Sequence, residues 1–279
     1  MRDHLDVLRT GDPVAEGTTR YGRGLASIPT QALLSVILPI VTAVIALVVW
    51  EILVTRSGIA ESILPPPTAV LSKLINFFEL ILTHGIPTTL ETFVAFGISI
   101  PLGIVLAAIM VYSRPINQAL YANLIFFQLI PKIALAPLFI VWLGIGAEAR
   151  IAFSIFICFF PILISTVTGL QAVDRDMLRL CQSVQASDWQ ILFHIRFPYS
   201  LPFIFAGMKV AVTLAIIGVV VGEFIASTKG LGYLILFASS RQQTDLGLAA
   251  ITVLCGVGLS FYGLVVLGEI VMKKFYEIQ

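Results

Sequence analysis

The sequence predicts an all-α polytopic membrane protein with six transmembrane helices, and three observations support this prediction. Hydrophobic residues make up 58% of the 279 residues, charged residues only 12%, and the mean hydropathy is +0.99. A soluble domain has about 25% charged residues. The apolar residues form continuous runs of the ~20 residues that a helix needs to cross the hydrocarbon core. These runs lack the alternating pattern of a membrane β-barrel.

The order of the apolar runs gives the predicted spans. They cover residues 31–54, 88–112, 119–145, 151–170, 203–225 and 246–268. Several prolines lie within or near them, where kinks are expected: Pro39, Pro101, Pro131, Pro137 and Pro161. Residues 1–30 contain acids, Gly and Pro before any apolar run, so we expect a solvated cytoplasmic tail and no signal peptide. Residues 31–279 then form one transmembrane domain.

The distribution of Lys and Arg predicts that both termini lie in the cytoplasm. With the N-terminus inside, the inner segments hold ten basic residues: Arg2, Arg9, Arg20, Arg23, Arg114, Arg175, Arg179, Arg196, Lys273 and Lys274. The outer segments hold five: Arg56, Lys73, Arg150, Lys229 and Arg241. Basic residues are enriched in cytoplasmic loops, so this excess sets the orientation. Residues 55–87 become an external connection, with a short amphipathic helix expected over 68–82.

A polar island, residues 174–202, separates the fourth and fifth spans and is predicted to hold two cytoplasmic helices. Asp174 and Asp176 suit a helix N-terminus, where negative charge is favoured. The apolar residues of this first helix recur at helical spacing, and we expect them to pack on the ends of the spans. They are Val173, Met177, Leu180, Cys181 and Val184.

The second helix of the island is expected to begin at Ser187. Ser187 followed by Gln190 is a capping-box pattern, in which each side chain bonds the other residue's backbone N–H. Pro198 and Pro202 are expected to end this helix before the fifth span begins. An amphipathic loop without a partner would show the same pattern, so that alternative stays open here.

The island also resembles the coupling loop of binding-protein-dependent ABC transporter permeases. That motif reads roughly Glu-Ala-Ala, three residues, Gly, nine residues, Ile, then a short gap and Leu-Pro. Arg179-Leu180-Cys181 stand at the Glu-Ala-Ala positions, Gln185 stands at the Gly, and Leu201-Pro202 match the Leu-Pro. The resemblance implies that an ATPase partner contacts Arg179, Cys181, Gln185, Ala186, Ser187 and Trp189.

Two departures from the motif have physical consequences. Arg179 in place of Glu reverses a charge at the expected contact with the ATPase. Gln185 in place of Gly costs about 1 kcal/mol if the turn requires a positive φ.

The wider resemblance covers about residues 60–275 and is closest to the importer branch for nitrate, sulfonates, taurine and pyrimidine precursors. The matching segments are Leu64–Pro67, Ile100–Gly103, Pro131–Leu138 with Trp142, Gly144 and Gly146, Gly218–Glu223, Ala226-Ser227, Gly230–Tyr233 and Thr244-Asp245. The family implies a bacterial inner-membrane protein, a second permease copy in a homodimer, an ATPase subunit and an external solute-binding protein. The chain has no phosphate-binding loop, so ATP and Mg²⁺ belong to the partner and no cofactor is expected here.

Charged residues in the spans are candidate pathway residues, because such groups usually face protein or water. Lys132 either lines the pathway and attracts an anionic or carbonyl-bearing solute, or extends to the interface or a local carboxylate. Glu223 is expected to accept backbone hydrogen bonds from the turn at Gly230 and Gly232, an outer gate. We expect Glu91 to be an interface residue, and Lys209 an interfacial anchor.

Other chemistry and other functions have weaker support. Cys158, Cys181 and Cys255 form no metal-binding pattern, no catalytic group is evident, and the net charge of +1 gives no reason to expect nucleic acid. A stand-alone secondary carrier would need an ion-coupling acid near mid-membrane and an internal repeat, and neither is evident. A non-transporting membrane scaffold remains the other alternative. The residues do not separate nitrate, sulfonates, a pyrimidine precursor or riboflavin as solutes.

Overall fold

The computed structural model describes residues 30–276, all of whose regular elements are helices. In chain order these are α1 (Thr30–Ser57), α2 (Pro67–Asn76), α3 (Phe78–Tyr112), α4 (Arg114–Leu129), the 3-10 helix η1 (Lys132–Leu135), α5 (Ala136–Leu143), α6 (Ala147–Gln171), α7 (Arg175–Ser183), α8 (Asp188–Ile191), the π-helix η2 (Leu192–Arg196), α9 (Phe197–Ala226), α10 (Leu231–Ser240) and α11 (Thr244–Tyr276). The predicted tail lies outside these residues except for Thr30.

Five helices in the described part are long and apolar enough to cross a membrane. They cover Ile37–Ser57, Phe78–Tyr112, Ala147–Gln171, Asp188–Ala226 and Thr244–Tyr276. They contain the second, fourth, fifth and sixth predicted spans and most of the first. The all-helical, multi-span architecture is therefore confirmed, although the second span begins earlier, at Phe78 rather than near Thr88.

The third predicted span is not one continuous helix. It is divided into α4, η1 and α5, with the break at Pro131. Ile130 is extended, at φ −66° and ψ 131°, because the ring of a following proline disfavours the helical conformation. The sequence indicated a kink at this proline, and the structure has a full interruption.

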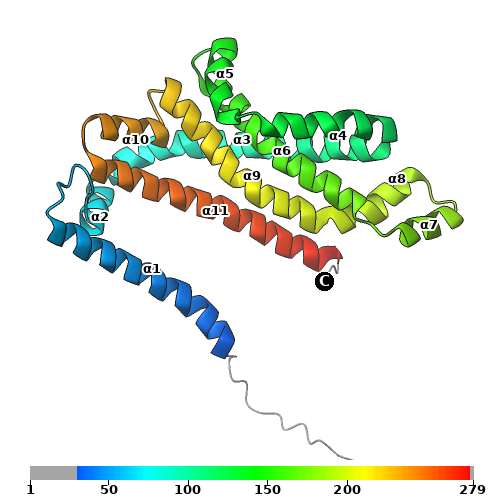
Figure 1. Cartoon of the computed structure of the whole chain (residues 1–279), viewed down its shortest axis with the longest axis horizontal. Helices are drawn as coiled ribbons and strands as arrows, with labels where there is room; N and C mark the ends of the chain where they lie inside the picture. Colours follow the sequence, from blue (N-terminus) through cyan, green and yellow to red (C-terminus); the bar gives the residue numbers. More distant parts are fainter. Residues whose placement is uncertain (1–29, 277–279) are drawn as a thin grey trace, which may run out of the picture. The chain divides into compact units, whose positions relative to one another are not determined.

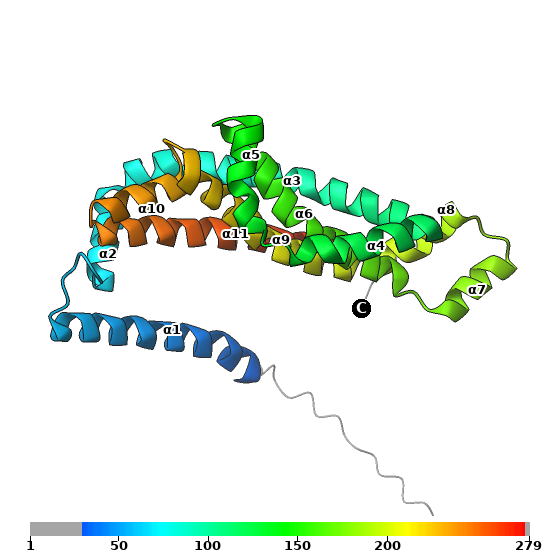
Figure 2. The same ribbon diagram turned by 45° about the horizontal axis from the view of Figure 1, so that its top comes forward.

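The chain divides into two units, residues 1–49 and residues 50–279. Within the second unit, α6 lies between α3 and α9 and packs most extensively against these two helices (Figures 1 and 2). At Gly218 of α9 the backbones approach so closely that a Cβ would lie 2.7 Å from the Cα of Ser154 in α6. The Ser154 hydroxyl also donates to the Ala215 carbonyl across this contact, at 2.8 Å. Small residues allow such close packing between membrane helices.

The second helix of the polar island continues into α9 without a break, which makes the expected stop at Pro198 and Pro202 wrong. Residues Asp188–Ala226 form one run of 39 residues. The π-turn η2 precedes Pro198 and bonds the Phe197 amide to the Leu192 carbonyl. A π-turn changes the hydrogen-bond register, so a proline with no N–H can follow it inside a helix.

Within the second unit, the island and the outer connection lie at opposite ends (Figures 1 and 2). α7 and α8 are at one end, and α2 and α10 are at the other. The expected amphipathic helix in the connection is α2, which begins at Pro67 and ends at Asn76. It is followed directly by α3. The helix α9 therefore joins the two ends of the unit.

Candidate functional site

The first helix of the island, α7, begins as the sequence indicated. The Asp174 carboxylate caps it by accepting a hydrogen bond from the Asp176 amide at 3.0 Å. Nη1 of Arg179 lies 3.3 Å from Oδ1 of Asp176, but both side chains are about four-fifths exposed, at 77% and 83%. Ion pairs this exposed contribute less than about 1 kcal/mol, so the Arg179 guanidinium is free to contact a partner.

The turn after α7 has a left-handed backbone conformation at Gln185, the position where the family motif has Gly. Gln185 has a φ of +57°. Its amide donates to the Gln182 carbonyl at 3.0 Å, and the Ala186 amide donates to the Cys181 carbonyl at 3.0 Å. These two bonds form a Schellman motif, whose left-handed residue is usually Gly. The Gln at this position is therefore conformationally strained.

The second helix of the island begins with the predicted capping box. The Ser187 amide donates to Oε1 of Gln190 at 2.8 Å, and the Gln190 amide donates to Oγ of Ser187 at 3.3 Å. Trp189, in the first turn, stacks on Phe193 with ring centroids 5.5 Å apart. The box fixes where the long helix through α9 starts, immediately after the strained turn.

The apolar face of α7 does not pack on the ends of the spans as predicted. Val173 is buried, but Met177, Leu180 and Val184 are exposed at 47%, 66% and 70%. The helix extends away from the spans (Figure 1). The helical spacing therefore identified the apolar face of α7 correctly, but it did not show which surface covers that face. An exposed apolar face is typical of a surface that another protein covers.

At the opposite end of α9, three side chains cap the N-terminus of α10. We call His84, Thr88 and Glu223 the capping cluster. The amides of residues 230, 231 and 232 donate to Nδ1 of His84 at 3.1 Å, Oγ1 of Thr88 at 2.8 Å and Oε2 of Glu223 at 2.6 Å. Thr88 also donates to Oε1 of Glu223 at 2.7 Å. The expected backbone bond from Gly232 to Glu223 is therefore present, and α3 contributes two further caps.

Two members of the capping cluster are almost completely buried, and His84 is half-buried. Thr88 and Glu223 are exposed at only 0% and 1%. Gly230 has a φ of +111°, and a Cβ there would overlap the Glu223 carboxylate. A buried polar group that loses its partner costs about 1–3 kcal/mol, so α10 is held at a fixed position against α3 and α9.

A second buried polar contact lies at the same end of the unit and joins α3 to α6. Arg150 donates to both carboxylate oxygens of Glu91, at 2.5 and 2.8 Å, and to the Ala226 carbonyl at 3.5 Å. Both side chains are about nine-tenths buried, at 11% and 9% exposed. The sequence placed Arg150 in an outer segment and Glu91 at the interface, near the outer end of the second span. It did not indicate that the two side chains form a buried pair, because the partners are distant in the chain.

The two lysines singled out from the sequence have different surroundings. Lys132 begins η1, donates to the Gln128 carbonyl at 3.2 Å and lies 5.2 Å above the Phe160 ring. Within residues 30–276 it forms no ion pair with a carboxylate. Lys209 pairs with Glu269 of α11 at 2.5 Å, and Glu269 also pairs with Lys273 at 3.1 Å. Lys209 therefore joins α9 to α11 as well as lying near a span end.

Several of these residues were missed by the sequence analysis. His84 and Thr88 are one helical turn apart, but the predicted second span began at Thr88 and left His84 in a loop. The spacing of His84 and Thr88, four residues apart on either side of the predicted start of the span, could have indicated that both lie on one face of one helix. No pattern marked Glu269 as a partner for Lys209.

Among the described residues, no group of His, Cys, Asp and Glu could hold a metal ion.

Comparisons with known proteins give a consistent result. The family model for the binding-protein-dependent transport system inner membrane component matches residues 99–274. A probable ABC transporter permease of Haemophilus influenzae is 33% identical, over 80% of this chain and 91% of that protein. The formylaminopyrimidine transport permease of Halalkalibacterium halodurans is 33% identical, over 71% and 78%. The taurine permease of Escherichia coli is 30% identical, over 78% and 82%.

Replacing Gln185 by Gly should stabilise the island turn. Glycine adopts a positive φ without steric cost, so we expect a gain of about 1 kcal/mol in the local opening free energy. Hydrogen exchange of the amides of residues 185 and 186 measures it. Gln182→Gly, in the helical part of α7, is the matched control and should lose about 1 kcal/mol. Equal effects at the two positions would contradict the assignment of strain to Gln185.

Replacing Thr88 by Val should destabilise the capping cluster at nearly constant volume. The change removes the donor to Glu223 and the acceptor for the residue 231 amide, so we expect a loss of about 2–6 kcal/mol, from two bonds at 1–3 kcal/mol each. Denaturant or thermal unfolding in detergent measures it. Thr89→Val is the control, because the Thr89 hydroxyl bonds only the Gly85 carbonyl of its own helix. The capping role fails if the two variants are equally stable.

Proposed function

Because this chain belongs to the family of binding-protein-dependent transport system inner membrane components, we propose that movement of its polar island opens and closes a path for a small solute. The chain is the permease subunit of an ABC importer and a multi-pass protein of the inner membrane. It is not an enzyme and binds no cofactor, since ATP is hydrolysed by a partner ATPase. An external solute-binding protein delivers the solute.

The topology we propose has six spans and both termini in the cytoplasm. The third span is the divided segment α4–η1–α5, which has more than the ~20 residues that a crossing needs. Two observations support it: the excess of basic residues in the alternate connections, and the position of the island and α10 at opposite ends of the second unit. Residues 31–279 then form the permease domain, with residues 174–202 as its cytoplasmic coupling loop.

The island is the proposed contact with the ATPase. The contacting residues are Arg179, Cys181, Gln185, Ala186, Ser187 and Trp189. The observation that carries this proposal is the exposed apolar face of α7 beside a free guanidinium, at the start of a helix that runs unbroken to Glu223. A displacement of α7 or α8 is transmitted along α9, because that helix contains no interruption that would absorb the displacement.

The opposite end of α9 is the proposed outer gate. Glu223 of α9 bonds the Gly232 amide and His84 of α3 bonds the Gly230 amide, so a shift of α9 relative to α3 acts on the cap of α10. Lys132 is proposed to line the solute path. The support is its position beside the break in the third span, with no carboxylate partner among the described residues.

The solute is proposed to be a small polar molecule, either an anion such as nitrate or a sulfonate, or a pyrimidine or vitamin precursor. The names of the relatives support this range, since one is a formylaminopyrimidine permease and another a taurine permease.

A second copy of the chain is proposed to complete the path, as a homodimer. No observation in the structure favours a stand-alone carrier or a scaffold over this function.

Reversing the charge of Arg179 tests the contact with the ATPase. We expect Arg179→Glu to lower solute-stimulated ATPase activity about tenfold, because a matched charge pair across a protein interface is worth about 1.5 kcal/mol or more. The complex of permease, ATPase and binding protein is reconstituted in liposomes. Arg175→Glu, the same reversal one turn earlier on α7, is the control and should change activity less than about twofold.

Two outcomes would count against this function. Unchanged stimulation in Arg179→Glu would mean that the ATPase does not contact the island there. Uptake by the chain alone, driven by an ion gradient without the ATPase, would identify a secondary carrier instead.

A further inference from the structure

An apolar groove lies where α3, α4, α6 and the start of α9 meet beside the island. We call it the inner groove. It has a volume of about 380 Å³, and its lining includes Val105, Ala108, Ile109, Leu170, Phe193 and Phe197. All of these are apolar, so water in the groove would find few hydrogen-bond partners.

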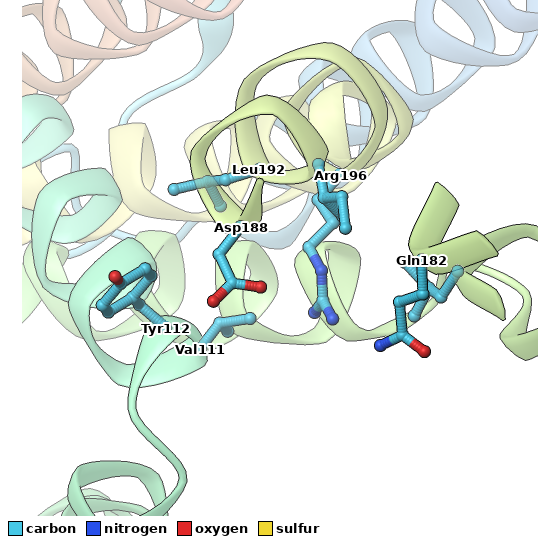
Figure 3. A pocket seen from close by; sticks show the side chains of 8 residues that line it. Val111, Tyr112, Gln182, Asp188, Leu192 and Arg196 are labelled. Atoms are coloured by element: carbon cyan, nitrogen blue, oxygen red, sulfur yellow. The ribbon is translucent and has the colours of Figure 1, made fainter. Parts of the chain in front are cut away.

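A polar cavity of about 350 Å³ adjoins the inner groove (Figure 3). The two share Tyr112 and Leu192 in their linings. Asp188, Arg196 and Gln182 supply the polar groups, and Figure 3 shows the Asp188 carboxylate and the Arg196 guanidinium directed to the same side of the helix that carries them. A charged cavity and an apolar groove therefore meet at one place on the molecule.

The Arg196 guanidinium has unused donors. It donates to the Leu170 carbonyl at 3.1 Å, and within residues 30–276 no carboxylate lies within the 4.0 Å of an ion pair. Arg196 is half-buried. Arginine has five N–H donors, so the Arg196 guanidinium can donate to further oxygens besides the Leu170 carbonyl. The geometry favours an oxygen-rich anion at this position.

The Asp188 carboxylate lines the same cavity and is exposed to solvent. It favours a cationic donor such as an ammonium group. The cavity thus presents one positive and one negative group, and the groove beside it presents an apolar channel. Tyr112 and Trp189 stand at their junction with ring centroids 5.7 Å apart, as aromatic residues do at a membrane interface.

We propose that the inner groove and its polar cavity bind one phospholipid whose headgroup carries both a phosphate and a primary ammonium, as in phosphatidylethanolamine. The phosphate lies at Arg196, the ammonium at Asp188, and an acyl chain occupies the inner groove. Phosphatidylglycerol lacks the cation, and the trimethylated ammonium of phosphatidylcholine has no N–H to donate. The proposal rests on the topology proposed above, which places this site at the inner membrane interface.

Binding of this lipid would brace the island. The cavity is lined by Leu178 of α7, Asp188 of α8 and Val111 of α3, so a bound headgroup contacts both the island and a span. The headgroup would hold α8 against the end of α3.

Native mass spectrometry of the permease with its ATPase partner in detergent tests the proposal. Phosphatidylethanolamine, phosphatidylglycerol and phosphatidylcholine with identical acyl chains are the probes. We expect phosphatidylethanolamine to bind about tenfold more tightly than the other two, as one charge-assisted hydrogen bond predicts. Asp188→Asn should remove that preference while keeping the shape of the cavity.

Filling the groove gives an independent readout. Ala108→Phe should lower binding of all three lipids at this site, because the ring occupies the space of the acyl chain. Ile98→Phe, at an exposed position of α3 outside the lining of the groove, is the control and should bind like the unchanged protein.

Two results would overturn the proposal. One is equal affinity for the three lipids in the unchanged protein and in Asp188→Asn. The other is full lipid binding by a folded Ala108→Phe. Solute uptake, measured after the same complexes are reconstituted in liposomes with the binding protein, separates this inference from the transport function, since active import without lipid preference contradicts only the lipid site.

Discussion

The helices of the second unit pack together most extensively where α6 meets α9. In lipid there is little hydrophobic force between helices, so close packing and interhelical hydrogen bonds must hold them together. Gly218 allows the α9 backbone to meet Ser154 of α6, and the Ser154 hydroxyl bonds the Ala215 carbonyl. This contact fixes α9 against α6 near the Arg150–Glu91 pair. Each proposed role of α9 assumes that it moves as a packed, rigid element.

The helix that runs through α9 is long and continuous, and it connects the two proposed functional ends of the permease. The run Asp188–Ala226 has 39 residues and is about 58 Å long at the rise of an α-helix. The island and its strained Gln185 turn lie at one end, and Glu223 with the N-terminus of α10 lies at the other. A buried, fully bonded cluster has few intermediate arrangements, so a shift of α9 against α3 either preserves the cap of α10 or breaks it.

The sequence predicted what depends on composition and local pattern, and missed what depends on partners distant in the chain. Continuous apolar runs located five spans, and the Ser187–Gln190 box was placed correctly because a cap is a local arrangement. The third span was expected to kink at Pro131 but is fully interrupted, and the apolar face of α7 was assigned to the spans although it is exposed. The pairs Arg150–Glu91 and Lys209–Glu269 join distant helices, so no spacing could reveal them.

Hydrogen exchange of the peptide that contains residues 230–232 tests whether α9 transmits movement from the island to the N-terminus of α10. The exchange is measured in the complex with the ATPase, before and after ATP is added. Because ATP binds only to the partner, any change in this peptide has crossed the membrane domain. We expect these amides to exchange faster with ATP, together with a change in the island amides at 181–187, since α9 carries the movement to the cap of α10. A response confined to the island, with residues 230–232 unchanged, would contradict it.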